Sequence, residues 1–158
     1  MFLWFIGASA LIVWNVFRDP AIDYRVLAVG SLLPDLLDVF TGRRVAHSVT
    51  VSVGVLVVLM LATIGRRVLR KRLLMLPIGM LLHLMLDGVF QSTRTFWWPV
   101  TGTATVVGRL PSLARPFGVS VFLELLGALA LRWIWKRFHL ADPAIRSVFV
   151  ATGRLPIP

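Results

Sequence analysis

The sequence predicts an all-α membrane protein, a polytopic transmembrane bundle of four to five helices that forms a single domain over residues 1–158. Three observations lead to this prediction. Hydrophobic residues make up 58% of the chain and the mean hydropathy is +0.84, whereas soluble domains are typically about 45–50% apolar. The apolar residues fall into five separate segments. The length also leaves room for no more than about five crossings of roughly 20 residues each.

The five apolar segments cover about residues 2–17, 25–40, 48–65, 73–91 and 117–138. The first has no basic residues before its apolar core, which argues against a cleaved signal peptide and favours a retained anchor. The second contains Pro34 and two aspartates, so we expect a broken or partly inserted helix there. The third is long and uniformly apolar, so we predict a helix despite its many β-branched residues.

Basic residues in short loops indicate which side of a membrane is cytoplasmic. Residues 66–72, RRVLRKR, hold five basic residues in seven positions and predict a cytoplasmic loop. We expect the last segment to return to the same side, ending in the basic residues of 132–137. Residues 91–116 are rich in Gly, Pro, Ser and Thr and predict an irregular outer loop. The short tail after His139 is expected on the cytoplasmic surface.

The chain is strongly basic and lacks cysteine. It has 17 Lys and Arg against 7 Asp and Glu, a formal net charge of +10. Such an excess fits nucleic acid, anionic lipid or anchoring of cytoplasmic loops, and the apolar composition favours the two membrane explanations. We therefore expect membrane lipid, and no nucleic acid, as a partner. Without cysteine any metal must be bound by His and carboxylate.

Six ionisable residues lie within or beside the apolar segments: Asp35, Asp38, His47, His83, Asp87 and Glu124. A charged side chain at the middle of a bilayer costs at least about 2.5–3.5 kcal/mol, so such residues usually face a partner, a water-filled cavity or a bound ion. Residues three or four positions apart project from the same face of a helix. Asp35 therefore lies beside Asp38, and His83 lies beside Asp87. If both helices run outward, these pairs and His47 meet at one level.

Imidazole and carboxylate groups are suitable ligands for zinc, manganese or iron. The sequence therefore predicts a divalent metal site, with zinc as the first choice, whose ligands are Asp35, His47, His83 and Asp87. Asp38 and Glu124 are candidate general bases that orient or deprotonate water. Arg43 and Arg44 are candidates for binding an anionic group of a substrate, such as a phosphate.

Each of these residues also has a purely structural explanation. His83 and Asp87 would serve as a hydrogen-bonded pair in helix packing. The two aspartates beside Pro34 would fit a turn, and His47 with Ser48 would fit the N-terminal cap of the next helix. The glutamate of the last segment would pair with an arginine or a Trp N–H, and the two arginines would anchor lipid headgroups. The joint placement of the cluster at one depth favours a shared site over these separate explanations.

Four motifs follow one another along the chain: GSLLPDLLD at 30–38, RRVAHS at 43–48, GMLLHLMLDG at 79–88 and FWWP at 96–99. Their order resembles that of the YdjM-type (DUF457) family of membrane-bound, metal-dependent hydrolases. The likeness spans residues 26–100, and LELLGALALRW at 123–133 is more loosely similar to actinobacterial members. The family often has a histidine before the arginine of the second motif, whereas this chain has Gly42, Arg43 and Arg44 there.

The resemblance implies a multi-pass protein of the bacterial inner membrane, with a metal site and a hydrolase activity. The implied site consists of Asp35, Asp38, His47, His83 and Asp87. Our leading hypothesis is therefore hydrolysis of an ester or phosphoester of a lipid-like, anionic substrate near the outer leaflet. The alternative is a non-enzymatic scaffold or accessory subunit, which uses the polar cluster to pack helices or to dock a second copy or a larger membrane complex. An ion pathway is disfavoured because the inner half of the longest segments is almost purely apolar.

Overall fold

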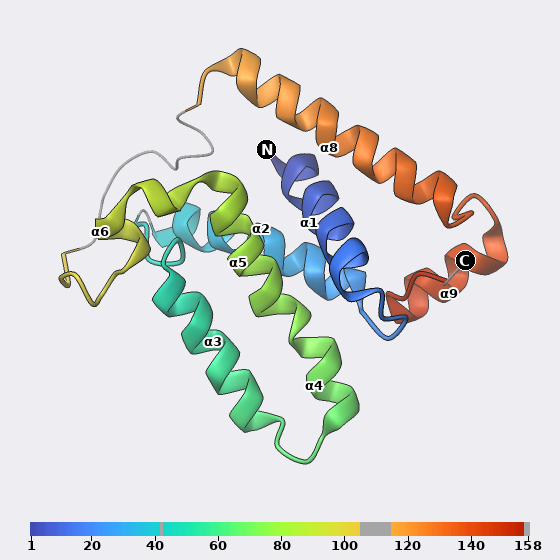
Figure 1. The fold of residues 1–158 in the computed structure, drawn as a ribbon, viewed down its shortest axis with the longest axis horizontal. Coiled ribbons are helices and arrows are strands. Elements are labelled where there is room, and N and C mark those ends of the chain that lie inside the picture. The colour runs from blue at the N-terminus through green and yellow to red at the C-terminus, as the bar shows by residue number, and fades with distance from the viewer. Residues whose placement is uncertain (42, 105–114, 157–158) are drawn as a thin grey trace.

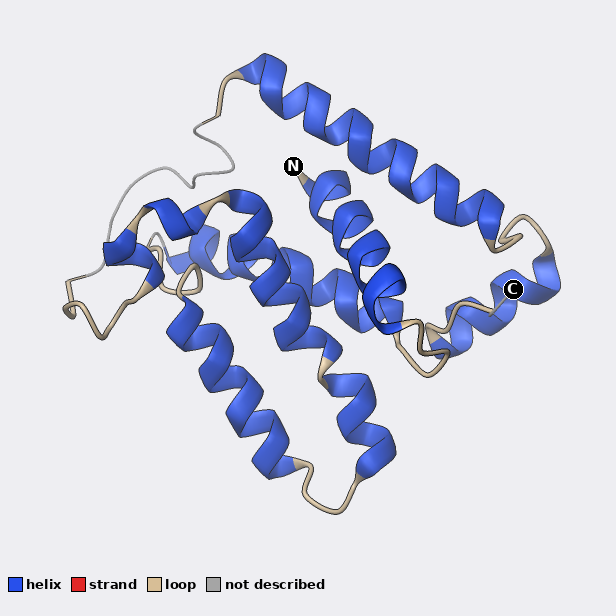
Figure 2. Ribbon diagram, viewed as in Figure 1, coloured by secondary structure: helices blue, strands red, loops and turns tan. Residues whose placement is uncertain are grey.

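The computed structural model describes the chain except residues 42, 105–114 and 157–158 (Figure 1). Throughout the described part the elements are helices and loops, which confirms the all-α prediction (Figure 2). The helices are α1 (Phe2–Phe17), α2 (Tyr24–Thr41), α3 (Val49–Ala62), α4 (Arg67–Leu73), α5 (Met75–Asp87), η1 (Val89–Gln91), α6 (Thr93–Phe96), α8 (Phe117–Arg137) and α9 (Pro143–Thr152).

Among the described helices, α8 alone is long and apolar enough to cross a membrane. Its 21 residues span about 30 Å, the thickness of a bilayer hydrocarbon core. Helices α1 and α3 are apolar but shorter, at 16 and 14 residues. Helix α2 carries two aspartates and α5 has only 13 residues. Length and composition therefore support a membrane span for α8, and the polytopic arrangement stays a prediction.

Four sequence-based expectations about the elements need correction. Helix α2 runs unbroken through Pro34, because its packing along α5 holds both halves in place despite the hydrogen bond that proline removes. The predicted basic loop is instead the helix α4. Helix α5 ends before residue 91, because Gly88 has a left-handed φ of 72°. The tail contains α9, which Asp142 caps by accepting a hydrogen bond from Ala144 N.

Helices α2 and α5 form the most extensive packing in the described chain, and glycines allow their backbones to touch. A Cβ atom at Gly30 would lie 2.2 Å from the carbonyl oxygen of Leu76, and one at Gly79 would lie 2.6 Å from that of Leu27. Such close crossings at small residues are typical of helices that pack within membranes. The contacts progress in the same direction along both helices, so α2 and α5 are parallel.

Helices α1 and α8 repeat this arrangement on the other side of α2. A Cβ atom at Gly7 would lie 2.6 Å from the carbonyl oxygen of Gly127, and one at Gly127 would lie 2.2 Å from the carbonyl carbon of Leu3. Further along, Trp14 contacts Trp133 and Phe138 through edge-to-face ring packing. These two helices are therefore parallel as well, and α1 lies between α8 and α2 (Figure 1).

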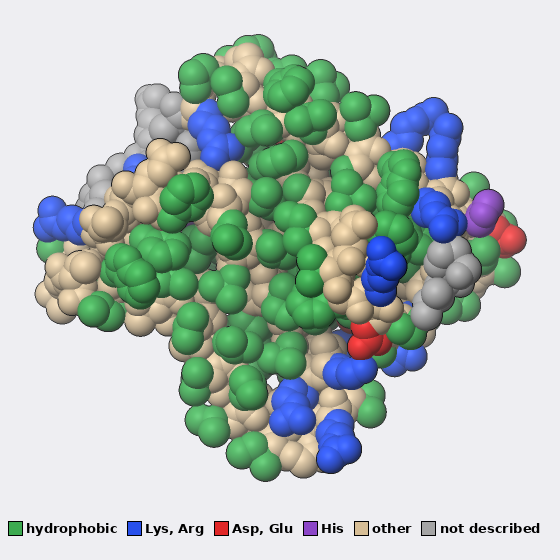
Figure 3. All heavy atoms as spheres, viewed as in Figure 1, with side chains coloured by type: hydrophobic (Ala, Val, Ile, Leu, Met, Phe, Trp, Pro, Cys, Tyr) green, Lys and Arg blue, Asp and Glu red, His purple; other side chains and the backbone are tan. Residues whose placement is uncertain are grey.

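The surface has an apolar middle and a basic end. Large apolar side chains are exposed on α3 and α8, including Val58, Leu61, Leu125 and Leu129, which are 59–64% exposed. Lys and Arg side chains gather over α4 and near the adjoining ends of α8 and α9 (Figure 3). Soluble monomers rarely expose apolar patches of this extent. The apolar middle suits contact with lipid tails, and the basic end suits contact with lipid headgroups.

Candidate metal centre

Two histidines and an aspartate come together at the end of the bundle opposite the basic end. Asp35 lies on α2, His47 lies in the loop between α2 and α3, and His83 lies on α5. All three are buried, and one ligand atom from each lies within 4.8 Å of the others. The parallel packing of α2 and α5 produces this meeting, because it carries Asp35 and His83 to the same level.

The distances identify the converging atoms. His47 Nε2 lies 3.3 Å from His83 Nε2 and 3.3 Å from Asp35 Oδ1. His83 Nε2 lies 3.6 Å from the same carboxylate oxygen. The sequence-based prediction that these three residues meet is confirmed.

Hydrogen bonds at the opposite ring nitrogens determine how the histidines face the cluster. His83 Nδ1 lies 2.7 Å from the carbonyl oxygen of Ser31, which can only accept, so Nδ1 carries the proton. His47 Nδ1 lies 2.6 Å from Asp38 Oδ2 and donates to it in the same way. In neutral rings both Nε2 atoms then present lone pairs to each other. Metal-binding histidines typically donate the N–H of their second ring nitrogen to a carboxylate or a backbone carbonyl, as both rings do here.

Asp38 holds the His47 loop as well as its ring. Its carboxylate accepts hydrogen bonds from the backbone N–H groups of Val45, Ala46 and His47, at 3.1, 2.8 and 3.2 Å. With the imidazole, Asp38 therefore has four donors. A carboxylate so fully engaged suits the positioning of a ligand, while its predicted role as general base stays a prediction.

Asp87, the fourth predicted ligand, lies on α5 beside this group but is not one of the three residues whose ligand atoms converge within 4.8 Å. Its Oδ2 lies 3.7 Å from His47 Nε2, and its side chain is fully buried. Within the described residues neither carboxylate oxygen accepts a hydrogen bond, although Arg115 Nη2 lies 3.3 Å from Oδ1 as an ion pair. Arg115 instead donates to the carbonyl oxygens of Leu86 and Asp87 at 3.2 and 2.8 Å. A buried carboxylate without hydrogen bonds is costly unless a cation binds it.

The carboxylates around His47 favour a positive charge on its ring. Burial lowers the pKa of His47, but hydrogen bonds and charge interactions with Asp35 and Asp38 outweigh burial and raise this pKa to about 9. A proton provides the charge when the site holds no metal. A divalent metal ion provides it with a matching ligand set, since two imidazole nitrogens and carboxylate oxygens suit zinc, manganese and iron.

The two arginines predicted to bind an anion lie differently. Arg43 is exposed at the surface, with its backbone bonded to the Thr41 hydroxyl. Arg44 lines a cavity of about 470 Å³ together with Asp87 and Arg115. The cavity therefore brings two guanidinium groups to the edge of the cluster. Gly42, where the family often has a histidine, lies outside the described residues.

Glu124 and Ser48 have contacts of their own. The carboxylate of Glu124 accepts a hydrogen bond of 2.9 Å from the backbone N–H of Leu3 and so ties α8 to α1; its role as a general base stays a prediction. Ser48 caps α3 by accepting from Thr50 N, as its structural explanation required. The Ser48 hydroxyl also reaches the carbonyl oxygens of Phe96 and Trp98, which links the second motif to the fourth.

Two contributors to the centre were missed by sequence reasoning. Ser31 lies one helical turn before Asp35, so its position on the cluster face of α2 was visible in the spacing. Ser31 holds His83 through its backbone carbonyl, a contact that the identity of the side chain does not indicate. Arg115 is distant in sequence from Asp87, and no local pattern connects the two.

Comparisons with protein-family models, with curated proteins and with solved structures find no match to this chain. The case for the metal centre therefore depends on the geometry of its residues.

Proposed function

We propose that this chain is a multi-pass hydrolase of the bacterial inner membrane, which uses a divalent metal to cleave an ester or phosphoester of a lipid-like substrate. One observation carries the proposal: the Nε2 atoms of two buried histidines lie 3.3 Å apart beside a carboxylate, and both rings are held through their Nδ1 atoms.

Asp35, His47 and His83 are the proposed ligands, and Asp87 is the fourth. The fit to a metal is supported by Asp87, whose buried oxygens accept no hydrogen bond from the described residues. Zinc is the first choice because neutral imidazoles and carboxylates in a four-ligand set are typical of its sites. Manganese and iron accept the same ligands.

A bound divalent cation supplies Lewis-acid polarisation of the scissile group and of the attacking water. Asp38 and the Ser31 carbonyl hold the two imidazoles in position. Arg44 and Arg115 line the adjoining cavity, where guanidinium groups would bind the anionic part of the substrate. Glu124 remains the predicted acceptor of a proton from water, and one of its oxygens already accepts from Leu3 N; the four donors at Asp38 favour a positioning role for that carboxylate.

The proposed membrane setting is supported by α8 and by the apolar surface. A spanning α8, with the basic end on the cytoplasmic side, directs the opposite end of the bundle and its metal centre toward the outer leaflet. The substrate would enter from the lipid, since exposed apolar side chains surround the bundle.

The test uses purified full-length protein that is stripped of metal and reloaded with zinc. Metal content is measured by mass spectrometry, and hydrolysis is assayed on a lipid phosphomonoester, a phosphodiester and a carboxylic ester. We expect one zinc per chain and turnover of one ester class, with both lost in His83→Ala and both kept in His139→Asn, a surface histidine. If reloaded wild type holds no stoichiometric metal, the proposal is wrong. If His83→Ala only lowers thermal stability, the scaffold alternative takes its place.

A further inference from the structure

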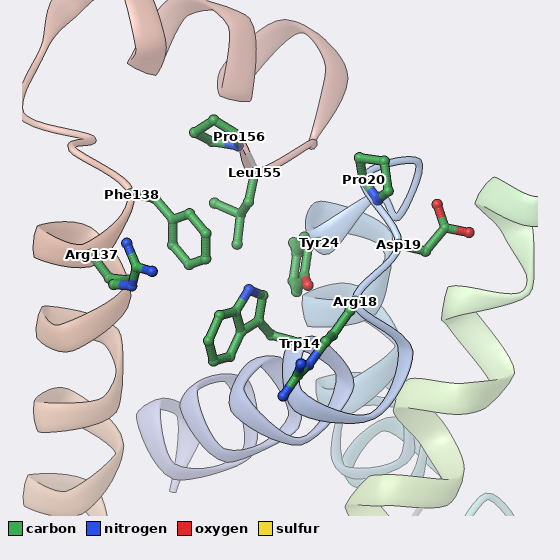
Figure 4. Close-up of a pocket in the computed structure, with 9 residues that line it drawn as sticks. All are labelled: Trp14, Arg18, Asp19, Pro20, Tyr24, Arg137, Phe138, Leu155 and Pro156. Atoms are coloured by element: carbon green, nitrogen blue, oxygen red, sulfur yellow. The ribbon is translucent and has the colours of Figure 1, made fainter. Parts of the chain in front are cut away.

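A second cavity, of about 310 Å³, lies at the basic end of the molecule (Figure 4). It is enclosed by the end of α1, the start of α2, the end of α8 and the segment after α9. Its lining includes Trp14, Arg18, Tyr24, Arg137, Phe138 and Leu155. Ligand pockets typically measure about 300–1,000 Å³, so the cavity has room for a small group and not for a whole lipid.

The apolar part of this cavity is held firmly in place. Tyr24, Phe138 and Leu155 are buried members of the hydrophobic core. Trp14 packs edge-on against Phe138, with ring centroids 5.8 Å apart. The wall therefore exists before any ligand binds, and a ligand meets little cost in ordering it.

The charged part is formed by two guanidinium groups. Arg18 and Arg137 lie on different sides of Trp14 (Figure 4), and both are exposed. Considering all residues that the structure describes, neither arginine has a hydrogen bond or ion pair, and the Trp14 indole N–H has no acceptor. These donors are available to a ligand.

The acid that lines the cavity does not neutralise these arginines. Asp19 Oδ2 lies 2.7 Å from Lys71 Nζ, and Asp19 Oδ1 accepts a hydrogen bond of 2.8 Å from Ala21 N. The Lys71 hydrogen bond is the main reason that the pKa of Asp19 lies below its ordinary value. With this carboxylate already paired, the cavity keeps a net positive charge.

The backbone adds an argument for Arg18. It ends α1 in the left-handed conformation, with a φ of 44°, which a non-glycine residue adopts rarely. Glycine adopts this conformation at a lower cost, so the backbone conformation alone does not account for an arginine at position 18.

We infer that this cavity binds the phosphate of an anionic phospholipid from the cytoplasmic leaflet. Arg18 and Arg137 would contact the phosphate, the Trp14 N–H would donate to it, and the aromatic wall would contact the glycerol and the first part of the acyl chains. The inference rests on the membrane orientation of the proposed function, in which the basic end faces the cytoplasm and the cavity would lie at headgroup level. The inference shares no residue with the metal centre and does not depend on hydrolase activity.

Native mass spectrometry of the purified protein in neutral detergent tests the inference, with phosphatidylglycerol or phosphatidylcholine added in increasing amounts. We expect one saturable phosphatidylglycerol adduct per chain and clearly weaker retention of phosphatidylcholine. In the double variant Arg18→Gln/Arg137→Gln the affinity for phosphatidylglycerol falls at least about tenfold, because the phosphate loses its charge-assisted hydrogen bonds to both guanidinium groups. Both arginines are exposed, so the variant retains the fold.

The matched control is Arg66→Gln/Arg67→Gln, which removes the same charge from exposed positions of the basic segment and leaves the adduct within about twofold of wild type. An equal loss in the control would show that only diffuse charge attracts the lipid, which overturns a defined site. Equal retention of the two lipids contradicts the inference. Competition by inorganic phosphate at the lipid concentration would assign the cavity to a soluble anion instead.

Discussion

Two buried aspartates near opposite ends of the bundle differ in what surrounds them. Asp23, 1% exposed, precedes α2 at the basic end. Its carboxylate accepts from the backbone N–H and the Nε of Arg25, both at 3.1 Å, from Arg25 Nη2 at 3.0 Å and from Arg72 Nε at 2.6 Å. Asp87, 5% exposed, accepts no hydrogen bond from a described residue.

The difference separates a carboxylate whose hydrogen bonds are supplied by the protein from one that we propose as a metal ligand. The Asp23 carboxylate joins the start of α2 to α4, because it accepts from both Arg25 and Arg72. The neighbouring residues add the end of α9, since Tyr24 N donates to the Gly153 carbonyl and Arg25 donates to that of Val150. All partners of the Asp23 carboxylate belong to the protein. Asp87 faces the Nε2 atom of His47 at 3.7 Å and forms an ion pair with Arg115 at 3.3 Å, and in the proposed function a metal ion would be its further partner. Burial is similar in the two places, so the supply of donors decides the role.

The largest expected effect is loss of the metal in His83→Ala. Removing a ligand nitrogen should lower zinc affinity by more than the roughly 10–100-fold that loss of an outer partner costs. Asp23→Asn should keep the full metal content, although it removes the charge of a side chain that is about as buried as His83. Equilibrium dialysis with zinc measures both variants, and equal zinc binding by His83→Ala and wild type would erase the distinction drawn here.

Asp38→Asn should have the next largest effect. An asparagine offers one acceptor oxygen where four donors now converge, so the His47 ring and its loop lose their support. Zinc affinity should fall about 10–100-fold while metal binding remains measurable. Asp142→Asn is the matched control, because this aspartate caps α9, away from the centre. A change confined to thermal stability would make Asp38 a folding residue only.

Asp23→Asn should act on stability alone. The substitution leaves the donors of Arg25 and Arg72 with one acceptor oxygen in place of a charged carboxylate, at a cost of about 1–3 kcal/mol. Arg72, whose side chain is 54% exposed, recovers part of this loss through water. Thermal unfolding followed by circular dichroism measures the effect. An unchanged melting temperature would show that the junction contributes little.

Acidification should give the smallest effect, and it should depend on Asp23. Burial raises the pKa of Asp23, but hydrogen bonds from Arg25 and Arg72 outweigh burial and bring the pKa below its ordinary value of 3.8. The stabilisation is therefore fully present above the ordinary pKa and is lost as the pH falls through the lower, folded-state pKa. Between about pH 5 and pH 3 the melting temperature should fall more in wild type than in Asp23→Asn. Equal falls would contradict a lowered pKa.

The fold could be predicted where the signal was local. Apolar segments marked the helices, and the spacing of Asp35 with Asp38 and of His83 with Asp87 placed each pair on one helix face. The helix α9 was missed although an Asp-Pro pair at 142–143 is a recognised helix start. The charges of residues 66–72 favour a cytoplasmic loop, but Arg, Lys and Leu are also good helix formers, and the segment forms α4.

The sequence predicted which side chains form the candidate site, but not the long-range contacts that bring them together. The meeting of α2 with α5 depends on a close crossing at Gly30 and Gly79, which single-sequence spacing does not specify. The same holds for the support of His83 by a carbonyl and for the approach of Arg115, since both are long-range contacts. The binding of Glu124 to the start of α1 is long-range as well.

X-ray absorption spectroscopy of the zinc-loaded protein tests the central claim most directly. The account predicts nitrogen and oxygen ligands at about 2.0–2.2 Å, with outer-shell scattering from two imidazoles that falls to one imidazole in His47→Ala. A spectrum without imidazole scattering, or one unchanged by that substitution, would contradict a metal held between His47 and His83.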